Sequence, residues 1–178
     1  MAVGKNNKEK RKISKKKKEA RIKSLPMAQQ VRPCDGCTEC CSVFGVEEID
    51  KDPWVPCQHL SHDGCGIYAT RPKYCRTFYC LWQNGMGSAS DRPDKLGVIF
   101  APTNGRTEFT KQQEIQAYEI EKGAFDNQQV VVLCQRFVDR GKLIIGHTYG
   151  GNSFRFMGPS DKVIKARKWA EDNEKKGI

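Results

Sequence analysis

The sequence predicts an α+β protein in which a small, irregular, cysteine-rich and metal-stabilised module packs with a small unit of antiparallel sheet and two helices. Two observations lead to this class. Eight of the nine cysteines lie between Cys34 and Cys80, in a stretch that is poor in aliphatic residues. After residue 95 the chain instead shows short apolar or alternating segments typical of strands, and longer amphipathic segments typical of helices. A length of 178 residues suffices for one domain with a small appendage.

Residues 1–32 are predicted to form a disordered basic arm. They contain twelve Lys and Arg and two Glu, which accounts for the whole formal net charge of +10. Ile13 and Ile22 are the only large apolar residues between positions 5 and 23, too few to dock on a core. The rest of the chain carries equal numbers of acidic and basic residues, which excludes a fold that coats nucleic acid with a generally basic surface. The arm could contact a polyanion (RNA, DNA or an anionic surface), or simply be a solvated tail.

Residues 33–85 are predicted to form the cysteine-cluster module. The segment has little periodicity and many turn pairs, such as Asp35-Gly36 and Asp63-Gly64. Burial of so few aliphatic side chains would hardly stabilise a fold, so we expect bound metal to contribute that stability.

Residues 86–178 are predicted to form a small α+β unit, which can pack with the module as one domain. Its first ten residues are rich in Gly, Ser, Asp and Pro and are typical of a linker or exposed loop. Asn104-Gly105 suits a tight hairpin turn, and Asp126 could cap the first helix. The expected strands are Leu96–Ala101, Arg106–Thr110, Ile115–Glu121, Leu143–His147 and Ser153–Met157, and the expected helices are Asp126–Arg140 and Asp161–Lys175.

The cellular compartment is predicted from what the sequence lacks. No apolar run is long enough to span a bilayer, and no apolar segment of a secretory signal follows the basic N-terminus. We therefore expect a cytoplasmic protein without a transmembrane segment. Cysteines in a reducing compartment seldom form disulfides, so these are more plausibly metal ligands, redox groups or buried thiols.

Cysteine spacing points to chelation. In the run Cys34-x2-Cys37-x2-Cys40-Cys41, each C-x2-C turn lets two thiolates converge on one ion. The predicted metal ligands are the eight clustered cysteines: Cys34, Cys37, Cys40, Cys41, Cys57, Cys65, Cys75 and Cys80.

The type of metal is less constrained than the ligands. Sets of thiolates favour an iron–sulfur cluster or Zn²⁺. The spacing of the first three cysteines is that of a bacterial ferredoxin, but the fourth follows immediately. Adjacent side chains are expected to point apart, so Cys40 and Cys41 suit two sites or a polynuclear cluster, which slightly favours iron–sulfur. Two four-coordinate sites are one possible division of the thiols, and other divisions stay open.

The combination of this run with Gly64–Cys80 (GCGIYATRPKYCRTFYC) resembles the YkgJ-type cysteine-cluster family, a zinc- or iron-chelating domain with a CxxCxxCC signature. The resemblance covers about residues 34–82. It implies bound metal, as an iron–sulfur cluster or zinc. A similar cluster occurs in the flagellin lysine N-methylase, so some relatives are enzymes, but no substrate site is carried over by the matching residues.

Three classes of function remain open at this stage. The leading prediction is a metal-binding protein with a multi-cysteine iron–sulfur or zinc site. One alternative is an iron–sulfur enzyme of redox or group-transfer type, such as protein methylation. The other is a zinc-stabilised protein that associates with nucleic acid through the basic arm. No catalytic residue is identified, and whether the chain is an enzyme stays open.

Other reactive side chains have simpler interpretations. Cys134 lies on the apolar stripe of the first expected helix and is predicted to be a core thiol. His59 and His62 could be ligands but are expected on a surface loop, and His147 ends a strand without a catalytic partner pattern. The aromatic residues of the module could stack bases, but a solvent-excluding shell around the metal is favoured: Phe44, Trp54, Tyr68, Tyr74, Phe78, Tyr79 and Trp82.

Overall fold

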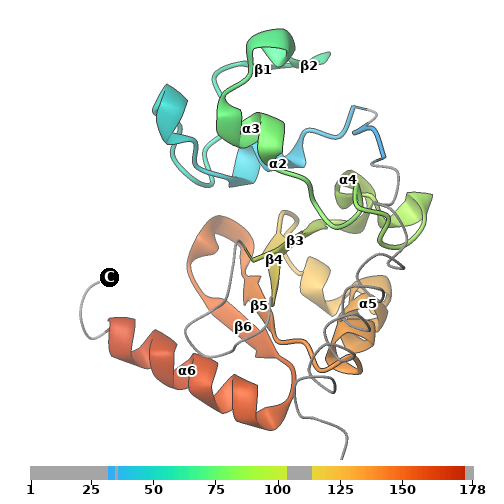
Figure 1. The fold of residues 1–178 in the computed structure, drawn as a ribbon, viewed down its shortest axis with the longest axis vertical. Coiled ribbons are helices and arrows are strands. Elements are labelled where there is room, and N and C mark those ends of the chain that lie inside the picture. Colours follow the sequence, from blue (N-terminus) through green and yellow to red (C-terminus); the bar gives the residue numbers. More distant parts are fainter. Residues whose placement is uncertain (1–31, 35, 104–113, 175–178) are drawn as a thin grey trace, which may run out of the picture. The chain divides into compact units, whose positions relative to one another are not determined.

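The structure is a computed structural model that describes residues 32–34, 36–103 and 114–174. These residues belong to one compact unit that spans Val31–Ile178. It contains both helices and strands, so the predicted α+β class is confirmed (Figure 1). The basic arm, the Asn104-Gly105 turn and the strand expected at Arg106–Thr110 lie outside the described residues. Within the described part, no helix combines the length and the apolar character needed to cross a membrane.

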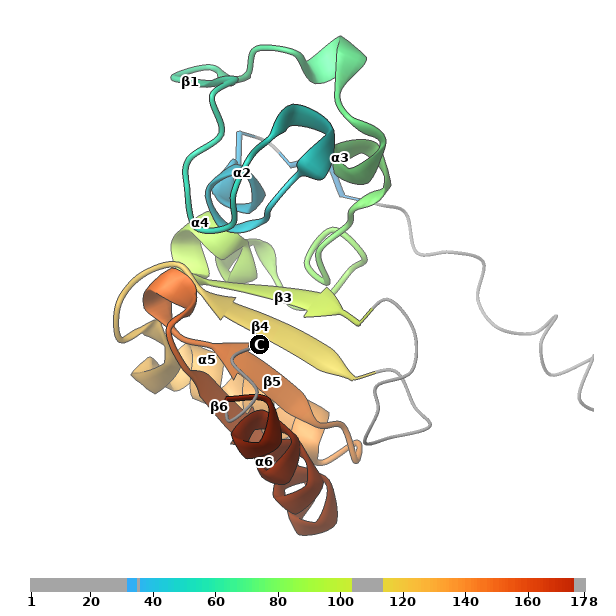
Figure 2. The same ribbon diagram turned by 90° about the vertical axis from the view of Figure 1, so that its left-hand side faces the viewer.

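A four-stranded sheet forms the centre of the unit, in the order β3 (Val98–Pro102), β4 (Ile115–Glu119), β5 (Ile144–His147) and β6 (Phe154–Met157) (Figure 2). Strands β3 and β4, and likewise β5 and β6, pair antiparallel, but β4 and β5 pair parallel. The predicted antiparallel pairing is therefore confirmed for β3–β4 and β5–β6 and is wrong for β4–β5. Helix α5 (Gln128–Val138) lies between β4 and β5 in the chain, and such a crossover is what a parallel pair requires.

Helix α5 packs its apolar stripe on one face of the sheet. Val130, Leu133 and Cys134 are buried in a cluster that includes Phe100 of β3. Cys134 is 5% exposed, and burial raises its pKa to about 11, so its prediction as a core thiol is confirmed. Asn127 caps the helix, because its side chain accepts a hydrogen bond from the backbone N–H of Gln129 at 2.8 Å. The prediction that Asp126 caps this helix is therefore wrong.

The cysteine-rich segment and the last helix both pack on the opposite face of the sheet. Ile99 and Tyr118, which are partners across β3 and β4, pack against the cysteine-rich segment. Further along the same face, Ile145 packs against Ala166 of the last helix, α6 (Ser160–Glu174). Apolar contacts thus anchor the cysteine-rich segment on the sheet.

Short elements make up the cysteine-rich segment, as expected for an irregular module. Among its described residues, the longest helices have five residues each, and one hairpin pairs two residues with two. The exposed carboxylate of Glu48 accepts hydrogen bonds from the backbone N–H groups of Lys73 and Tyr74, at the start of the helix Lys73–Thr77. In chain order the elements are α2 (Glu39–Val43), η1 (Glu47–Ile49), β1 (Leu60–Ser61), β2 (Gly64–Cys65), η2 (Tyr68–Thr70) and α3 (Lys73–Thr77).

Residues 86–95 are not the linker that their composition predicts. They contain the 3₁₀ helix η3 (Ala89–Asp91) and helix α4 (Pro93–Leu96). Asp91 is buried, forms a capping box with Ser88, and accepts a hydrogen bond from the Gln129 amide of α5 at 2.6 Å. Local capping, and not a lack of structure, therefore explains the polar composition.

Candidate metal centre

All eight clustered cysteines line two adjoining cavities. The larger cavity, of about 430 Å³, is lined by every one of them except Cys80. The smaller, of about 20 Å³, is lined by Cys80 together with Cys34, Cys37 and Cys40. The fold therefore brings together all the residues that the sequence predicts as ligands, and keeps Cys134 apart in the other core cluster.

Four of these residues form what we call the outer group: Cys41, Cys57, Cys65 and Cys75. Burial raises the pKa of Cys75, and negative charge on the three other members raises it further, so the four thiols lie within electrostatic reach of one another. The backbone N–H of Cys57 also donates to the carbonyl of Cys41 at 3.0 Å, which joins two distant parts of the segment.

The other four form the inner group: Cys34, Cys37, Cys40 and Cys80. Burial raises the pKa of Cys37 to about 11, and burial likewise raises that of Cys80. The largest effects on the pKa values of Cys40 and Cys80 are the Cys41 side chain and burial, respectively, and both raise the pKa. Charge on Cys34 raises both pKa values further. Cys34 also accepts a hydrogen bond from the Gln83 amide at 3.0 Å. The apolar walls of the cavity come from Phe78, Trp82, Pro93 and Ile99.

The two groups meet at helix α2. Interaction between the Cys40 and Cys41 side chains raises the pKa of Cys40 and lowers that of Cys41. Cys40 lines both cavities, whereas Cys41 lines the larger one only. One short helix carries a sulfur atom of each group, so the two groups are neighbours.

A buried cation faces the outer group. Lys51 is 7% exposed, and its ammonium donates to the carbonyls of Phe44 at 2.6 Å and Asp52 at 2.9 Å. Burial lowers the pKa of Lys51, whereas the nearby thiols raise it. The charges of Lys51 and Arg71 in turn lower the pKa of Cys41. Sequence analysis does not single out Lys51, because nothing in the local pattern distinguishes this lysine from a solvated one.

The donor set fits a thiophilic metal. In the described ranges, no three His, Cys, Asp or Glu side chains already have the arrangement of a metal site, and none of the nine cysteines forms a disulfide. Each group nevertheless offers four sulfur atoms, the number that a tetrahedral Zn²⁺ or a four-iron cluster uses. The buried Lys51 charge complements the negative charge that such a centre would carry.

The two histidines of the module lie away from the thiols. The side chain of His62 is fully exposed and contacts only Asp63, at 3.2 Å, among the described residues. His59 interacts with the Gln58 amide at 3.4 Å. Neither residue lines the two cysteine cavities.

The aromatic residues of the module are divided between packing and the surface. Phe44 and Trp82 are buried, and Phe78 packs against them, as expected for an apolar shell. Tyr68 and Tyr79, in contrast, are exposed. The shell interpretation therefore describes the inner part of the aromatic set only.

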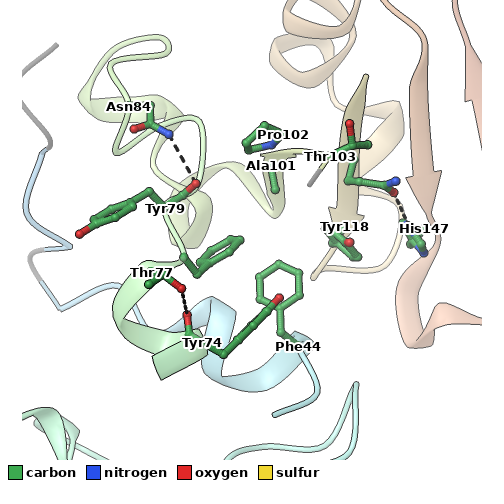
Figure 3. A pocket seen from close by; sticks show the side chains of 12 residues that line it. Phe44, Tyr74, Thr77, Tyr79, Asn84, Ala101, Pro102, Thr103, Tyr118 and His147 are labelled. Carbon is green, nitrogen blue, oxygen red and sulfur yellow. Dashed lines mark hydrogen bonds between the residues drawn. The ribbon is translucent and has the colours of Figure 1, made fainter. Parts of the chain in front are cut away.

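A second constellation, on the sheet, was missed because it is assembled by strand pairing. His147 lies opposite Tyr118 across β4 and β5, and their rings stack at 4.4 Å (Figure 3). The imidazole Nε2 is 2.6 Å from Oε1 of Gln116. Burial lowers the pKa of His147 to about 4.

We expect His147 to make stability fall between about pH 6.5 and pH 4. The unfolded state binds a proton near its ordinary pKa of 6.5, whereas the folded state resists protonation down to about 4. Stability is therefore complete above pH 6.5 and decreases by roughly 3 kcal/mol as the pH falls to 4. Denaturant unfolding across this range measures how the free energy of unfolding depends on pH, and this dependence should be weaker for His147→Gln than for the natural chain. Equal dependence on pH would contradict the expectation, and acid release of any bound metal would affect both proteins alike.

Comparisons with known proteins gave no relative. No protein-family model matches the chain, and no significant match was found among curated proteins or solved structures. The resemblance to the YkgJ-type family therefore stays a prediction.

Proposed function

We propose that this chain is a metal-binding protein whose eight clustered cysteines hold two adjoining four-thiolate centres. The observation that carries the proposal is the convergence of all eight side chains on two neighbouring cavities. These residues come from α2, β2, α3 and the loops before, between and after them, so they converge through tertiary folding and not through spacing alone.

We favour iron–sulfur centres over Zn²⁺ in both groups. Cys40 and Cys41 are adjacent in the chain but belong to different groups, which suits two closely spaced or polynuclear centres better than one isolated mononuclear ion. When bound, such a centre would supply either cross-links that stabilise the module or a site for one-electron transfer. The chain's own contribution is an apolar inner wall that excludes water, the Gln83 amide on Cys34, and the buried charge of Lys51.

An iron–sulfur enzyme is the second candidate. A third cavity, large enough for a small molecule, shares Phe44, Tyr74 and Phe78 with the walls of the cysteine cavities. A substrate there would lie next to the thiol groups. The nine free thiols also suit a reducing compartment, and we accordingly propose that the protein acts in the cytoplasm.

Anaerobic purification followed by metal analysis tests the main proposal. We expect iron and acid-labile sulfide, with a broad absorption band near roughly 400 nm. A colourless protein with one or two zinc ions per chain would replace iron–sulfur by zinc but retain the metal centres. A folded chain with no transition metal would refute the proposal.

A further inference from the structure

A separate cavity of about 460 Å³ lies on the face of the sheet that the cysteine-rich segment covers (Figure 3). Gln116, Tyr118 and His147 of the two central strands line one side of it. Aromatic rings of the cysteine-rich segment line the other side, among them Phe44 and Tyr74. Its volume is in the range of small-molecule sites.

Rings surround this cavity in several orientations. Phe44 meets Tyr118 edge-on at 4.8 Å, and Tyr118 stacks on His147 with an angle of 11° between their planes. Phe78 is 4.6 Å from Phe44 and tilted against it. A planar ring is the ligand shape that such walls contact best, through stacked and edge contacts.

The described wall of the cavity carries no charged side chain. None of the twelve described residues that line it is Asp, Glu, Lys or Arg. Burial lowers the pKa of His147 to about 4 and raises the pKa of Tyr118 to about 12, so both rings are neutral near pH 7. An ionic ligand would lose water here without gaining a counter-charge, which favours a neutral ligand.

Gln116 and His147 each leave a polar atom available to a ligand. Oε1 of Gln116 can only accept a hydrogen bond, so Nε2 of His147 carries the proton and its Nδ1 has a free lone pair. Among the described residues, neither this Nδ1 nor the Gln116 amide nitrogen has a hydrogen-bond partner, and neither is sealed from solvent. This pair therefore offers one acceptor and one donor, beside the hydroxyls of the lining tyrosines.

We propose that this cavity binds a neutral planar lactam ring, the N–H and carbonyl edge of a nucleobase, in the form of a free base or nucleoside. The ring N–H would donate to Nδ1 of His147, and the carbonyl would accept from the amide of Gln116. The rings of Phe44 and Tyr118 would contact the base. The site is additional to the thiol centres and uses none of the cysteines.

Calorimetric titration of the full-length, anaerobically purified chain with uridine and inosine tests the proposal. We expect saturable binding, at least tenfold weaker for N3-methyluridine and 1-methylinosine, which lack the ring N–H. His147→Phe keeps a ring but removes the acceptor, and Gln116→Leu removes the donor, so both should weaken uridine binding at least tenfold. Gln128→Leu, on the exposed start of α5, is the matched control and should bind normally.

A measurement on the natural chain keeps the test independent of how the variants fold. Addition of uridine should shift the ¹⁵N resonance of His147 Nδ1, as expected when a lone pair accepts a hydrogen bond. The proposal is overturned if neither nucleoside binds the folded chain, if the N-methylated forms bind equally well, or if uridine monophosphate binds tenfold more tightly than uridine. Because the metal content of the same sample is measured separately, failure here leaves the metal proposal intact.

Discussion

Removal of two thiols from one group is expected to lower the metal content by about half, because that centre loses half of its ligands while the other centre keeps all four. Cys57→Ser with Cys75→Ser disables the outer group, and Cys34→Ser with Cys80→Ser disables the inner group. The four substitutions together should leave almost no metal. Iron, zinc and acid-labile sulfide per chain, measured after anaerobic purification, give the result.

The control for these variants is Cys134→Ala. This thiol is buried against the sheet and belongs to neither group, so its loss should leave the metal content unchanged. If either double substitution removed all the metal from a chain that still folds, the eight thiols would form one centre. If neither changed the content, the clustered cysteines would not be the ligands.

Glu114→Ala is expected to cause the largest loss of stability outside the cysteine-rich segment, about 3–5 kcal/mol. Glu114 is 0% exposed, and its carboxylate accepts from the backbone N–H of Leu143 at 2.6 Å and from Lys162 Nζ at 3.0 Å. Truncation leaves both donors without this acceptor in a buried site. Denaturant unfolding of the natural chain and the variant measures the difference.

A double-mutant cycle separates the ion pair from the rest of this effect. Glu114→Gln keeps an acceptor for Leu143 and should cost less than Glu114→Ala. Lys162→Met removes the cation, so its combination with Glu114→Gln should cost less than the sum of the two single changes. A loss below about 1 kcal/mol for Glu114→Ala would show that the carboxylate contributes little, as many exposed ion pairs do.

Much of the fold could be predicted locally. Strands β4, β5 and β6 and helices α5 and α6 lie within a few residues of their predicted positions, because alternation and helical stripes are properties of short segments. The parallel direction of the β4–β5 pair and the helical structure of residues 86–95 could not be predicted locally. The first depends on which strands become neighbours after the α5 crossover, and the second on a buried Asp91 that bonds a glutamine in α5.

The candidate sites show the same division. Clustering and spacing of the cysteines were sufficient to select all eight side chains that converge in the fold, since chelating residues must recur at short separations. Their division into inner and outer groups, the buried ammonium of Lys51, and the pairing of Gln116 with His147 arise between segments that are distant in the chain. Only tertiary structure could decide them, because strand register and packing set which side chains share a cavity.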